Sequence, residues 1–373
     1  MNRIVITLPE FQPGEGAKIE YMLSTGALRV HIRKPGATEE QVRGLIESIS
    51  RRFYHRISLH DHLDLAVEYG LGGVHLNSRY PAPPPGFSGL VSRSCHSISE
   101  LLDHNDLDYL LLSPIFNSIS KKDYKSAFSD QELQRAKSEG ILDAHVYALG
   151  GVRPALFGTL AKYGFGGAAL MGAAWNPVDA SQFRIQYIAP DSTNVETMLK
   201  QGCRWVQLRM KDARSPEILR PAGIIAPLCR KYGATFVLDD RVDLVEATGA
   251  DGVHLGANDI PVDQARQILG PGYIIGATAN DFSAIEKATN SGADYVGLGP
   301  LRFTTTKKNL SPILGNEGYE RIMEQVRTAH ITLPVTAIGG IVPSDLERLW
   351  QAGVQGVAAS GAIESILLSQ SNK

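Results

Sequence analysis

The sequence predicts two tandem (β/α)8 barrels of the TIM type, an α/β architecture that arose by internal duplication. Three observations support this prediction. The chain has 373 residues, which is more than one hydrophobic core usually contains. Motifs of the first half recur in order in the second half. In the second half, short apolar runs alternate eight times with amphipathic stretches, as parallel strands connected by helices do.

The internal repeat consists of four motif pairs that keep their order along the chain. The pairs are GGVHL (72–76) with DGVHL (251–255), LDYLLLSPIF (107–116) with ADYVGLGPLR (293–302), HVYALGGVRP (145–154) with PVTAIGGIVP (334–343), and GGAALMGAA (166–174) with QGVAASGAI (355–363). Because the spacing between partners drifts only slightly, a gene duplication with small insertions explains the repeat, and chance does not.

The second copy can be divided into strands and helices directly. Its apolar runs, each bounded by turn residues, are RIQYIA, RWVQLRM, TFVLDD, DGVHLG, YIIGATA, DYVGLGP, PVTAIGG and GVAASG. The stretches 215–233 and 343–353 between these runs have amphipathic helical patterns. Eight strand–helix units favour a closed barrel, because open doubly wound sheets more usually have five or six strands.

The repeat also predicts the domain boundaries. We expect a first barrel at residues 1–175, a linker at 176–182 and a second barrel at 183–373. The run WNPVDASQ indicates the linker, since its Pro, Asn and Ser residues interrupt both periodicities. Each copy has about 180 residues, which is short for this fold, so the loops must be tight.

Composition and charge argue against nucleic-acid-binding, secreted and membrane proteins. The net charge of −2 gives no electrostatic footprint for nucleic acid or an anionic membrane, so any anion site must be local. Cys95, Cys203 and Cys229 lack disulfide or metal-ligand spacing, which fits a reducing cytosol. The run MNRIVITLPEF indicates a strand and not a signal peptide, and no window approaches the roughly 18 apolar residues of a membrane span. We therefore expect a cytoplasmic protein whose partners are small molecules.

Polar residues and glycines collect at the C-terminal ends of the strands of the second copy, where barrels of this type have their active sites. They are Gln207, Arg209, Lys211, Asp239, Asp240, Arg241, Asn258, Asp259, Thr278, Thr304, Thr305, Thr306, Lys307, Gly339, Gly340 and Gly361. The glycines after the last two strands each lead into a helix, so backbone N–H groups can face a phosphate there. Taken alone, they are equally explained as tight turns. Thr304, Thr306 and Lys307 on the neighbouring loop favour the phosphate site.

Two carboxylates predict a second anion subsite. Asp240 and Asp259 follow adjacent strands, so their side chains can converge on one hard cation. Magnesium favours one or two carboxylates together with substrate phosphate oxygens and water. Either aspartate alone is more simply a helix cap, but Arg209 and Lys211 on the next strand favour a site for a metal diphosphate. His254, inside DGVHLG, is interpreted as a core or supporting histidine.

The second copy also resembles a known family. The ordered motifs QLRMK, VLDDRVDL, GVHLGANDIP, IIGAT, GADYVGLGP, TTTK and PVTAIGGI make it similar to thiamine phosphate synthase. The resemblance implies a magnesium-dependent transferase. It joins 4-amino-2-methyl-5-hydroxymethylpyrimidine diphosphate to thiazole phosphate, with release of diphosphate. The implied mechanism is dissociative, since the thiazole nitrogen captures the cation that remains when diphosphate leaves.

The resemblance implies a role for each matched position. The pyrimidine diphosphate would be bound by Gln207, Arg209, Lys211 and Lys307, magnesium by Asp240 and Asp259, and the thiazole phosphate by Thr304, Thr306 and Gly340. Arg209, Lys211 and Lys307 would also be catalytic, because they neutralise the leaving group.

Three positions depart from the family pattern but remain substrate-binding candidates. Asp239 stands in the place of the usual Asn, and Thr278 in the place of a Ser. Gly361 replaces another Ser, with Ser360 beside it. The extra carboxyl of Asp239 would be protonated, hydrogen-bonded to Arg241, or a third contact to the metal.

The first copy keeps the phosphate side of this site and loses much of the diphosphate side. On the diphosphate side the correspondences are Arg33 with Arg209, Pro35 with Lys211, Asp61 with Asp240, and Arg79 or Tyr80 with Asp259. On the phosphate side Ser118, Ser120 and Lys121 match Thr304, Thr306 and Lys307, and Gly150, Gly151 and Gly172 match the glycines of the second copy.

This pattern resembles the thiazole tautomerase family, which binds thiazole phosphate without a diphosphate. Tautomerisation needs an acid–base residue, and the candidates are His31, His60, His62 and His96. The family's usual base position, just before the phosphate loop, is Pro114 here. A first barrel that binds thiazole phosphate without chemistry therefore stays open, as does a structural partner in an intrachain pseudo-dimer.

Two other readings apply to the whole chain. One is a different phosphate-handling TIM-barrel enzyme, such as an isomerase or an aldolase of a sugar phosphate. An aldolase would want a lysine inside a strand, and the eight strand cores contain none. The other is a non-catalytic binding module, which predicts loss of charge at both subsites, whereas the second copy keeps it. A homo-oligomer is also compatible with the sequence.

Overall fold

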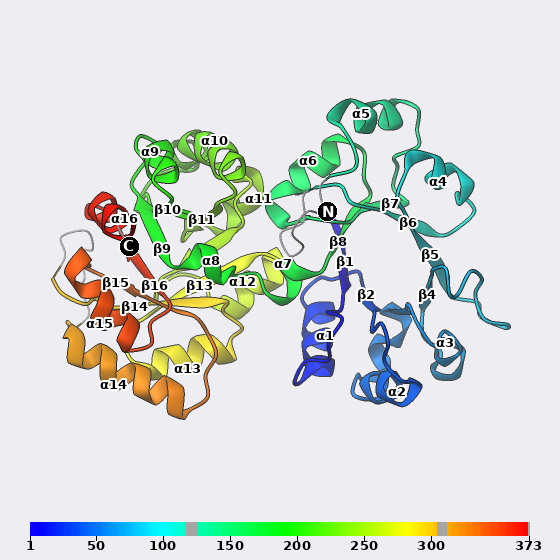
Figure 1. Ribbon diagram of the computed structural model, residues 1–373, viewed down its shortest axis with the longest axis horizontal. Coiled ribbons are helices and arrows are strands. Elements are labelled where there is room, and N and C mark those ends of the chain that lie inside the picture. Colours follow the sequence, from blue (N-terminus) through cyan, green and yellow to red (C-terminus); the bar gives the residue numbers. More distant parts are fainter. Residues whose placement is uncertain (117–125, 304–311, 372–373) are drawn as a thin grey trace. The chain divides into compact units, whose positions relative to one another are not determined.

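A computed structural model describes residues 1–116, 126–303 and 312–371 of the chain (Figure 1). The chain forms two compact units. The first contains Met1–Asn176, and the second contains Pro177–Leu269 and Tyr273–Lys373. Each unit holds a closed barrel of parallel strands, so the predicted pair of barrels is confirmed. Within the described ranges, no helix is long and apolar enough to cross a membrane.

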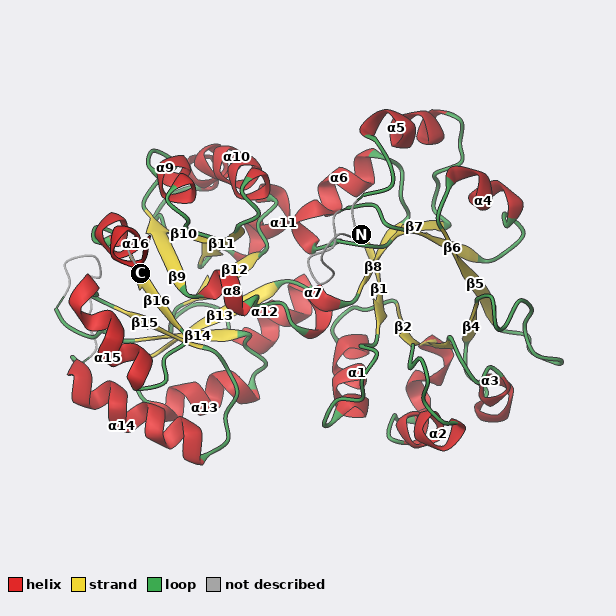
Figure 2. Ribbon diagram, in the orientation of Figure 1, coloured by secondary structure: helices red, strands yellow, loops and turns green. Residues whose placement is uncertain are grey.

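The first barrel closes where its last strand pairs with its first, with Asn2 opposite Gly167. Its strands are β1 (Asn2–Ile6), β2 (Arg29–Ile32), β3 (Ile57–Leu59), β4 (Gly73–Leu76), β5 (Leu90–Cys95), β6 (Tyr109–Leu112), β7 (Val146–Ala148) and β8 (Gly167–Leu170). The helices are α1 (Glu15–Ser24), α2 (Glu39–Glu47), η1 (Arg51–Arg56), α3 (Asp64–Tyr69), α4 (Ile98–Asp103), α5 (Asp130–Ser138), η2 (Pro154–Leu156), α6 (Phe157–Lys162) and α7 (Gly172–Trp175). Figure 2 shows these helices around the strands.

The second barrel repeats this arrangement, and every predicted apolar run contains one of its strands. They are β9 (Ile185–Ala189), β10 (Trp205–Leu208), β11 (Thr235–Asp239), β12 (Gly252–Leu255), β13 (Ile274–Ala279), β14 (Tyr295–Leu298), β15 (Val335–Ile338) and β16 (Gly356–Ala359). The helices are α8 (Ala180–Phe183), α9 (Val195–Lys200), α10 (Ser215–Lys231), η3 (Val242–Leu244), α11 (Val245–Thr248), α12 (Val262–Leu269), α13 (Phe282–Asn290), α14 (Gly315–Thr328), η4 (Pro343–Asp345), α15 (Leu346–Gln351) and α16 (Ile363–Ser371).

Local sequence signals explain where several helices begin. Thr38 accepts a hydrogen bond from the backbone of Gln41, whose side chain accepts one from the backbone of Thr38, a capping box that starts α2. Ser129 and Glu132 form the same box before α5. The predicted linker contains a short helix of its own, α8, whose first turn is capped by Asp179.

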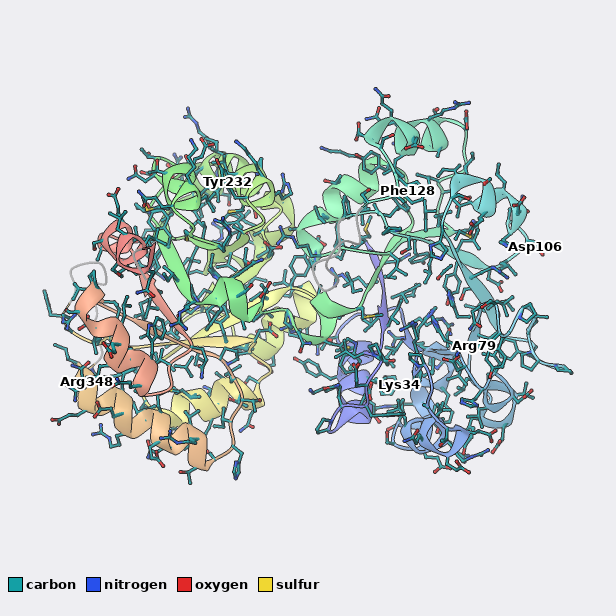
Figure 3. The ribbon with its side chains drawn as sticks, in the orientation of Figure 1. Lys34, Arg79, Asp106, Phe128, Tyr232 and Arg348 are labelled. Carbon is teal, nitrogen blue, oxygen red and sulfur yellow. The ribbon has the colours of Figure 1, made fainter. Side chains whose placement is uncertain are left out.

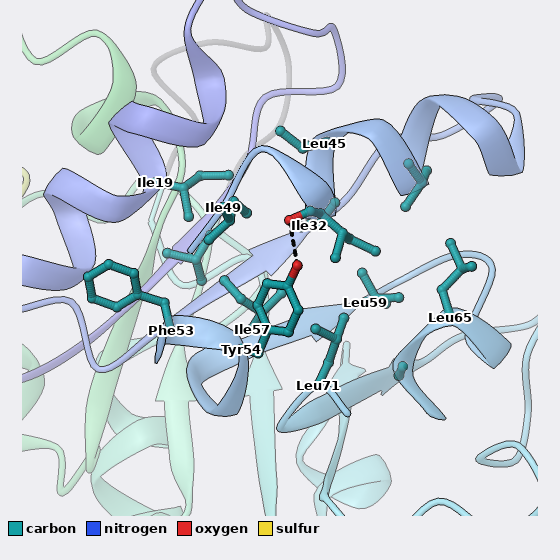
Figure 4. Packing of buried hydrophobic residues seen from close by; sticks show 14 of the residues in the cluster. Ile19, Ile32, Leu45, Ile49, Phe53, Tyr54, Ile57, Leu59, Leu65 and Leu71 are labelled. Carbon is teal, nitrogen blue, oxygen red and sulfur yellow. Dashed lines mark hydrogen bonds between the residues drawn. The ribbon is translucent and has the colours of Figure 1, made fainter. Parts of the chain in front are cut away.

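Apolar side chains fill the space between the strands of the first barrel and its helices (Figure 4). Ile19 of α1, Leu45 of α2 and Ile32 of β2 belong to one buried cluster. The Tyr54 hydroxyl, the polar end of a buried ring, donates to the backbone carbonyl of Ile46 at 3.1 Å. Each fully buried aliphatic side chain of this kind contributes about 1.5–3 kcal/mol to folding, so this layer holds the strand ends in place.

Aromatic rings fill the interior of the second barrel. Phe183, Trp205 and Tyr295 meet edge to face, with ring centroids 5.3–5.4 Å apart. Gly276 makes room for one of these rings, because a Cβ there would lie 2.2 Å from the Tyr295 ring. Tyr295 also points its hydroxyl at His254, at 3.0 Å from Nδ1. The core and the polar end of the barrel are thus in direct contact.

Candidate active site

A cavity opens at the C-terminal ends of the strands of the second barrel, where the sequence predicts the site. Residues at the ends of all its strands line it: Ile188, Gln207, Arg209, Lys211, Asp239, Asp240, His254, Gly256, Thr278, Asn280, Gly299, Pro300, Ile338, Gly339, Gly340, Ala358 and Ser360. Most of the predicted substrate-binding residues outside the neighbouring threonine loop are therefore neighbours in space.

Asp239 is the centre of the charged side of the cavity. Gln207 Nε2 donates to Asp239 Oδ1 at 2.6 Å, and Arg209 Nε lies 3.2 Å from Asp239 Oδ2. Lys211 Nζ lies 3.6 Å from the same oxygen. The hydrogen bond to Arg241 considered from the sequence is wrong, because Arg241 pairs with Asp243 at 2.6 Å and donates to Ser215. Asp239 instead fixes three groups that face the cavity.

Burial controls the ionisation of this network. It raises the pKa of Asp239, while the charges of His254, Lys211 and Arg209 lower it and that of Asp240 raises it further. Burial lowers the pKa of Lys211, but the hydrogen bond to Asp240 and the nearby carboxylates outweigh this effect, so its pKa is raised overall. Lys211 therefore stays charged at neutral pH, as a group that binds an anion must.

The carboxylates of Asp240 and Asp259 come together as predicted. Burial and the hydrogen-bonding contact with Asp259 raise the pKa of Asp240, against the effect of Lys211. Lys211 forms an ion pair with Asp240 Oδ2. Asp259 Oδ2 also accepts from the backbone N–H of Gly256 at 2.6 Å, which holds the loop after β12. Asp259 therefore both shapes its own turn and meets its neighbour.

The residues fit a magnesium ion at this point. Asp240 Oδ1 is buried, and among the described residues no donor forms a hydrogen bond with it. Asp240 also has a φ of +64°, an uncommon backbone conformation for a residue other than glycine. A buried acceptor oxygen beside a second carboxylate is satisfied by a hard cation with oxygen ligands. Asp240 and Asp259 would be the residues that hold it.

His254 is a buried residue that lines the cavity. It is 6% exposed, and Nε2 lies 3.1 Å from the Thr278 hydroxyl while Nδ1 faces Tyr295. Both ring nitrogens thus have hydroxyl partners, and the histidine connects Thr278 to the aromatic core. This arrangement agrees with its interpretation as a supporting residue.

The glycine loop after β15 forms the opposite side of the cavity. Gly339 and Gly340 have φ values of +94° and +70°, which favour glycine. Arg302 supports this loop, because Nη1 donates to the Gly340 carbonyl at 2.6 Å and both Nη atoms bind the Asp345 carboxylate at 2.5 and 2.7 Å. Backbone N–H groups here can face a phosphate that approaches closely.

Several predicted site residues fall elsewhere. Thr304, Thr306 and Lys307 of the second copy and Ser118, Ser120 and Lys121 of the first lie outside the described residues. Asp259 and Gly361 are described but are not among the residues that line the cavity. Asn280 lines it and was missed, although it directly follows β13 and so stands at a strand end like the others. Its Nδ2 donates to the Gly299 carbonyl at 2.5 Å.

Among the residues that the structure describes, the corresponding end of the first barrel lacks the charged cluster. Pro35 takes the place of Lys211, and the side chain of the preceding Lys34 is buried in an ion pair of 2.7 Å with Glu15. Asp61, the counterpart of Asp240, pairs with Arg79. Figure 3 labels both Lys34 and Arg79. The remaining carboxylate thus has a cationic side chain of the protein as its partner.

The candidate acid–base histidines of the first barrel are a buried pair, His31 and His60, and two more accessible residues, His62 and His96. His31 and His60 contact each other through Nδ1 and Nε2 at 2.9 Å. His62 Nε2 lies 2.9 Å from the Ala37 carbonyl. His96 is exposed, with Nδ1 3.0 Å from the carbonyl of Ser113, the residue before Pro114. The phosphate-loop glycines of this barrel keep their geometry, since Gly151 has a φ of +65°.

Fold and cavity together define a class of protein, the barrel enzymes that bind phosphorylated small molecules at the C-terminal ends of their strands. The chain belongs to the thiamine monophosphate synthase family, whose model matches residues 14–174 and again residues 186–363. The two matches fall in the two barrels, as expected for a duplication. The chain is accordingly a transferase that acts on small-molecule substrates.

Individual relatives agree with the family. A thiamine-phosphate synthase of Phocaeicola vulgatus is 54% identical over 165 residues, which are 44% of this chain and 79% of that protein. One of Flavobacterium psychrophilum is 40% identical over 201 residues, 51% of this chain and 98% of that protein. A solved thiamine phosphate pyrophosphorylase of Bacteroides thetaiotaomicron aligns with 35% identity over 48% of this chain and 87% of that one, with a TM-score of 0.44.

Proposed function

We propose that the second barrel joins 4-amino-2-methyl-5-hydroxymethylpyrimidine diphosphate to thiazole phosphate, giving thiamine phosphate and diphosphate. The observation that carries this proposal is the cluster of Arg209, Lys211 and Asp240 around Asp239 at one side of the cavity. The names of the relatives, thiamine-phosphate synthase, support the same reaction.

Charge neutralisation is the main task in this reaction. The C–O bond between the hydroxymethyl carbon and the diphosphate breaks, and its electron pair leaves with the diphosphate. Arg209 and Lys211 would stabilise that developing charge, and Asp239 holds both cations in position before the substrate binds. Magnesium, bound by Asp240 and Asp259, would supply further neutralisation of the leaving group.

Positioning is the second task. The thiazole nitrogen forms the new C–N bond, so the thiazole must lie against the face of the pyrimidine carbon from which it attacks. The glycine loop of Gly339 and Gly340, supported by Arg302, would hold the thiazole phosphate. Anchoring each substrate through its own phosphate groups makes the two reacting atoms neighbours, which lowers the entropic part of the barrier.

The test gives the purified full chain both substrates with magnesium and follows thiamine phosphate. Asp240→Asn should abolish magnesium-dependent turnover while thiazole phosphate still binds, because the glycine loop is unchanged. Asp61→Asn, the matched change in the first barrel, should leave turnover as it is. Absence of turnover in the unmodified chain, or equal losses in both variants, would contradict the proposal.

For the first barrel, the position of His96 favours isomerisation of a thiazole phosphate as the function. Its imidazole is exposed beside Ser113 and Pro114, where the resemblance expects an acid–base residue. In the full chain, His96→Gln should slow the isomerisation at least tenfold, whereas the exposed His55→Gln should not change it. An unmodified chain that leaves the isomerisation rate at its uncatalysed value would instead favour a binding or structural role.

A further inference from the structure

Three histidines gather inside the first barrel at the ends of neighbouring strands. His31 lies on β2, His60 directly follows β3, and His75 lies on β4. They are 0%, 7% and 2% exposed, respectively. One ring nitrogen of each lies within 4.8 Å of those of the other two. The proposed isomerisation at His96 uses none of them.

The three rings contact one another directly. His31 Nδ1 lies 2.9 Å from His60 Nε2, so one of these nitrogens carries a proton and donates it to the lone pair of the other. The His60 and His75 rings stack, with centroids 4.1 Å apart and planes inclined by 20°. The centroids of His31 and His75 are 5.3 Å apart. A cation that accepts lone pairs from these ring nitrogens can replace that proton.

Hydroxyl groups orient two of the rings from outside. His31 Nε2 lies 2.6 Å from the Tyr109 hydroxyl, which leaves Nδ1 to face the other histidines. Both His75 nitrogens have hydroxyl partners, Nδ1 with Ser92 at 2.9 Å and Nε2 with Ser94 at 3.0 Å, so one of these two hydrogen bonds must open when His75 binds an ion. Outer hydrogen bonds of this kind fix ring orientation and tautomer in metal sites.

The matching positions of the second barrel indicate where this cluster lies. His31 corresponds to Gln207, His60 to Asp239 and His75 to His254, as the motif alignment gives. All three counterparts line the cavity at the barrel mouth. The first barrel has thus exchanged an amide and a carboxylate for imidazoles at positions that face a substrate in its sister. Imidazole nitrogen suits zinc, nickel and copper, whereas carboxylate oxygen suits magnesium.

We propose that the first barrel binds one zinc-like transition-metal ion through His31, His60 and His75. Three protein ligands leave a further coordination position for water or a bound molecule, as in catalytic zinc sites. Zn–N distances of about 2.0–2.1 Å place ligand nitrogens about 3.3 Å apart in a tetrahedral site. Nitrogens that lie up to 4.8 Å apart therefore need to close by up to about 1.5 Å, and the stacked His60 and His75 rings must turn so that their nitrogens converge, which requires side-chain rotation.

The surroundings keep the imidazoles in the neutral form that binds metal. Burial lowers the pKa of His31 and His60 well below the usual range, and His75 with the nearby Arg29 and Arg33 adds to this effect. Burial, with the charges of Arg93 and Arg33, lowers the pKa of His75 to about 3. Those arginines also oppose a cation, and the Asp61 carboxylate that follows His60 is already paired with Arg79, so the binding must come from the three imidazole nitrogens.

The test titrates the full chain, freed of metal by a chelator, with Zn²⁺ and with Co²⁺ in excess Mg²⁺. The Mg²⁺ occupies the carboxylates of the second barrel, so that the new site is observed alone. We expect one ion per chain and a Co²⁺ visible spectrum typical of a low-coordinate nitrogen site. His31→Gln, which restores the side chain of its counterpart Gln207, and His60→Asn, which gives an uncharged side chain of the size of its counterpart Asp239, should each weaken Zn²⁺ binding at least tenfold.

His55→Gln is the matched control, because His55 is an exposed histidine of the same barrel and should not affect binding. Circular dichroism of each variant checks that it has folded. If a variant does not fold, X-ray absorption of the unmodified zinc-loaded chain decides, since three imidazole ligands are expected. A chain that binds no ion at micromolar concentration, retains full affinity in either folded variant, or has fewer than three imidazole ligands overturns the proposal.

Discussion

After β10 the second barrel carries Lys211 in an ion pair with Asp240, whereas after β2 the first barrel carries Pro35, and Asp61 pairs with Arg79. The same carboxylate has therefore been kept in both copies with different partners. Among the described residues, each carboxylate has one buried oxygen without a hydrogen-bond donor, Asp240 Oδ1 and Asp61 Oδ2, but only Asp240 has a second carboxylate, Asp259, beside it. In the first barrel an arginine already neutralises Asp61.

The two barrels also differ at three positions near the C-terminal ends of their second, third and fourth strands. The second barrel has Gln207, Asp239 and His254 there, and Asp239 accepts from Gln207 and pairs with Arg209. The first barrel has three histidines there, held neutral by burial. If both proposals hold, a few substitutions at strand ends change the ligands of one barrel from phosphate anions with a hard cation to a metal bound by nitrogen, on the same eight-stranded fold.

The largest expected difference between the barrels concerns the arginine that both copies keep, Arg209 in the second barrel and Arg33 in the first. Arg209→Gln should lower kcat/KM of the synthase reaction by about 10²–10³, because a preorganised donor to the leaving group is lost. Arg33→Gln, at the matching position of the first barrel, should leave it within twofold. Steady-state kinetics of both variants measure this. Similar losses from the two changes would mean that the first barrel takes part in the same reaction.

Acid should destabilise the first barrel before the second in metal-free protein. The pKa values of His31, His60 and His75 are lowered by folding, so below about pH 6.5 the unfolded chain binds more protons, and stability falls as pH falls. Each histidine contributes up to about 1.4 kcal/mol per pH unit.

In the second barrel, folding raises the pKa of Asp239, so that the native state binds the extra proton and stability is lost as pH rises through the folded pKa. The two barrels therefore respond to acid with opposite sign in these groups. Hydrogen exchange resolved by peptide, at pH 7 and pH 5, measures both barrels in one chain. Equal loss of protection in the two barrels would contradict the assignment of the effect to the histidines.

The glycine loop gives a smaller effect. Gly340→Ala places a Cβ 2.4 Å from Arg302 Cγ at a φ of +70°, which should cost about 1–2 kcal/mol and weaken thiazole phosphate binding. Gly361→Ala meets no atom within 4 Å and should have little effect on stability. Thermal unfolding and phosphate-substrate titrations compare the two variants. A milder result for Gly340→Ala than for Gly361→Ala would contradict the role of this turn.

The smallest effect is expected at Asp239. Its carboxylate competes with the diphosphate for Arg209 and Lys211, so Asp239→Asn should lower the KM for the pyrimidine diphosphate about threefold to tenfold. Asp243→Asn, which changes a carboxylate that binds Arg241 instead, is the control. An increase in KM would mean that positioning of the two cations outweighs their neutralisation.

Much of this could be predicted from the sequence because barrel strands follow simple rules. The strands are short and buried on both faces, so each of them appears as an apolar run. Eight such runs in the second copy, together with the repeat, predicted eight strands in each barrel. Polar residues after those runs had to meet at one end, which brought Arg209, Lys211 and Asp240 together in the prediction as in the structure. The correspondence between copies also followed from the motif order alone.

Side-chain partners were decided only by the tertiary structure. A hydrogen bond to Arg241 was one of three roles that the sequence left open for Asp239, but the chain turns after β11, and Arg241 reaches Asp243 while Asp239 faces Gln207 and Arg209. The histidine cluster could not be predicted from the sequence, because His31, His60 and His75 lie far apart in the chain, on or directly after three different strands. The sequence by itself determined the two barrels and the end of each that carries function. Which side chains share a proton, a cation or an anion depends on distances of a few ångströms, and only barrel closure sets these.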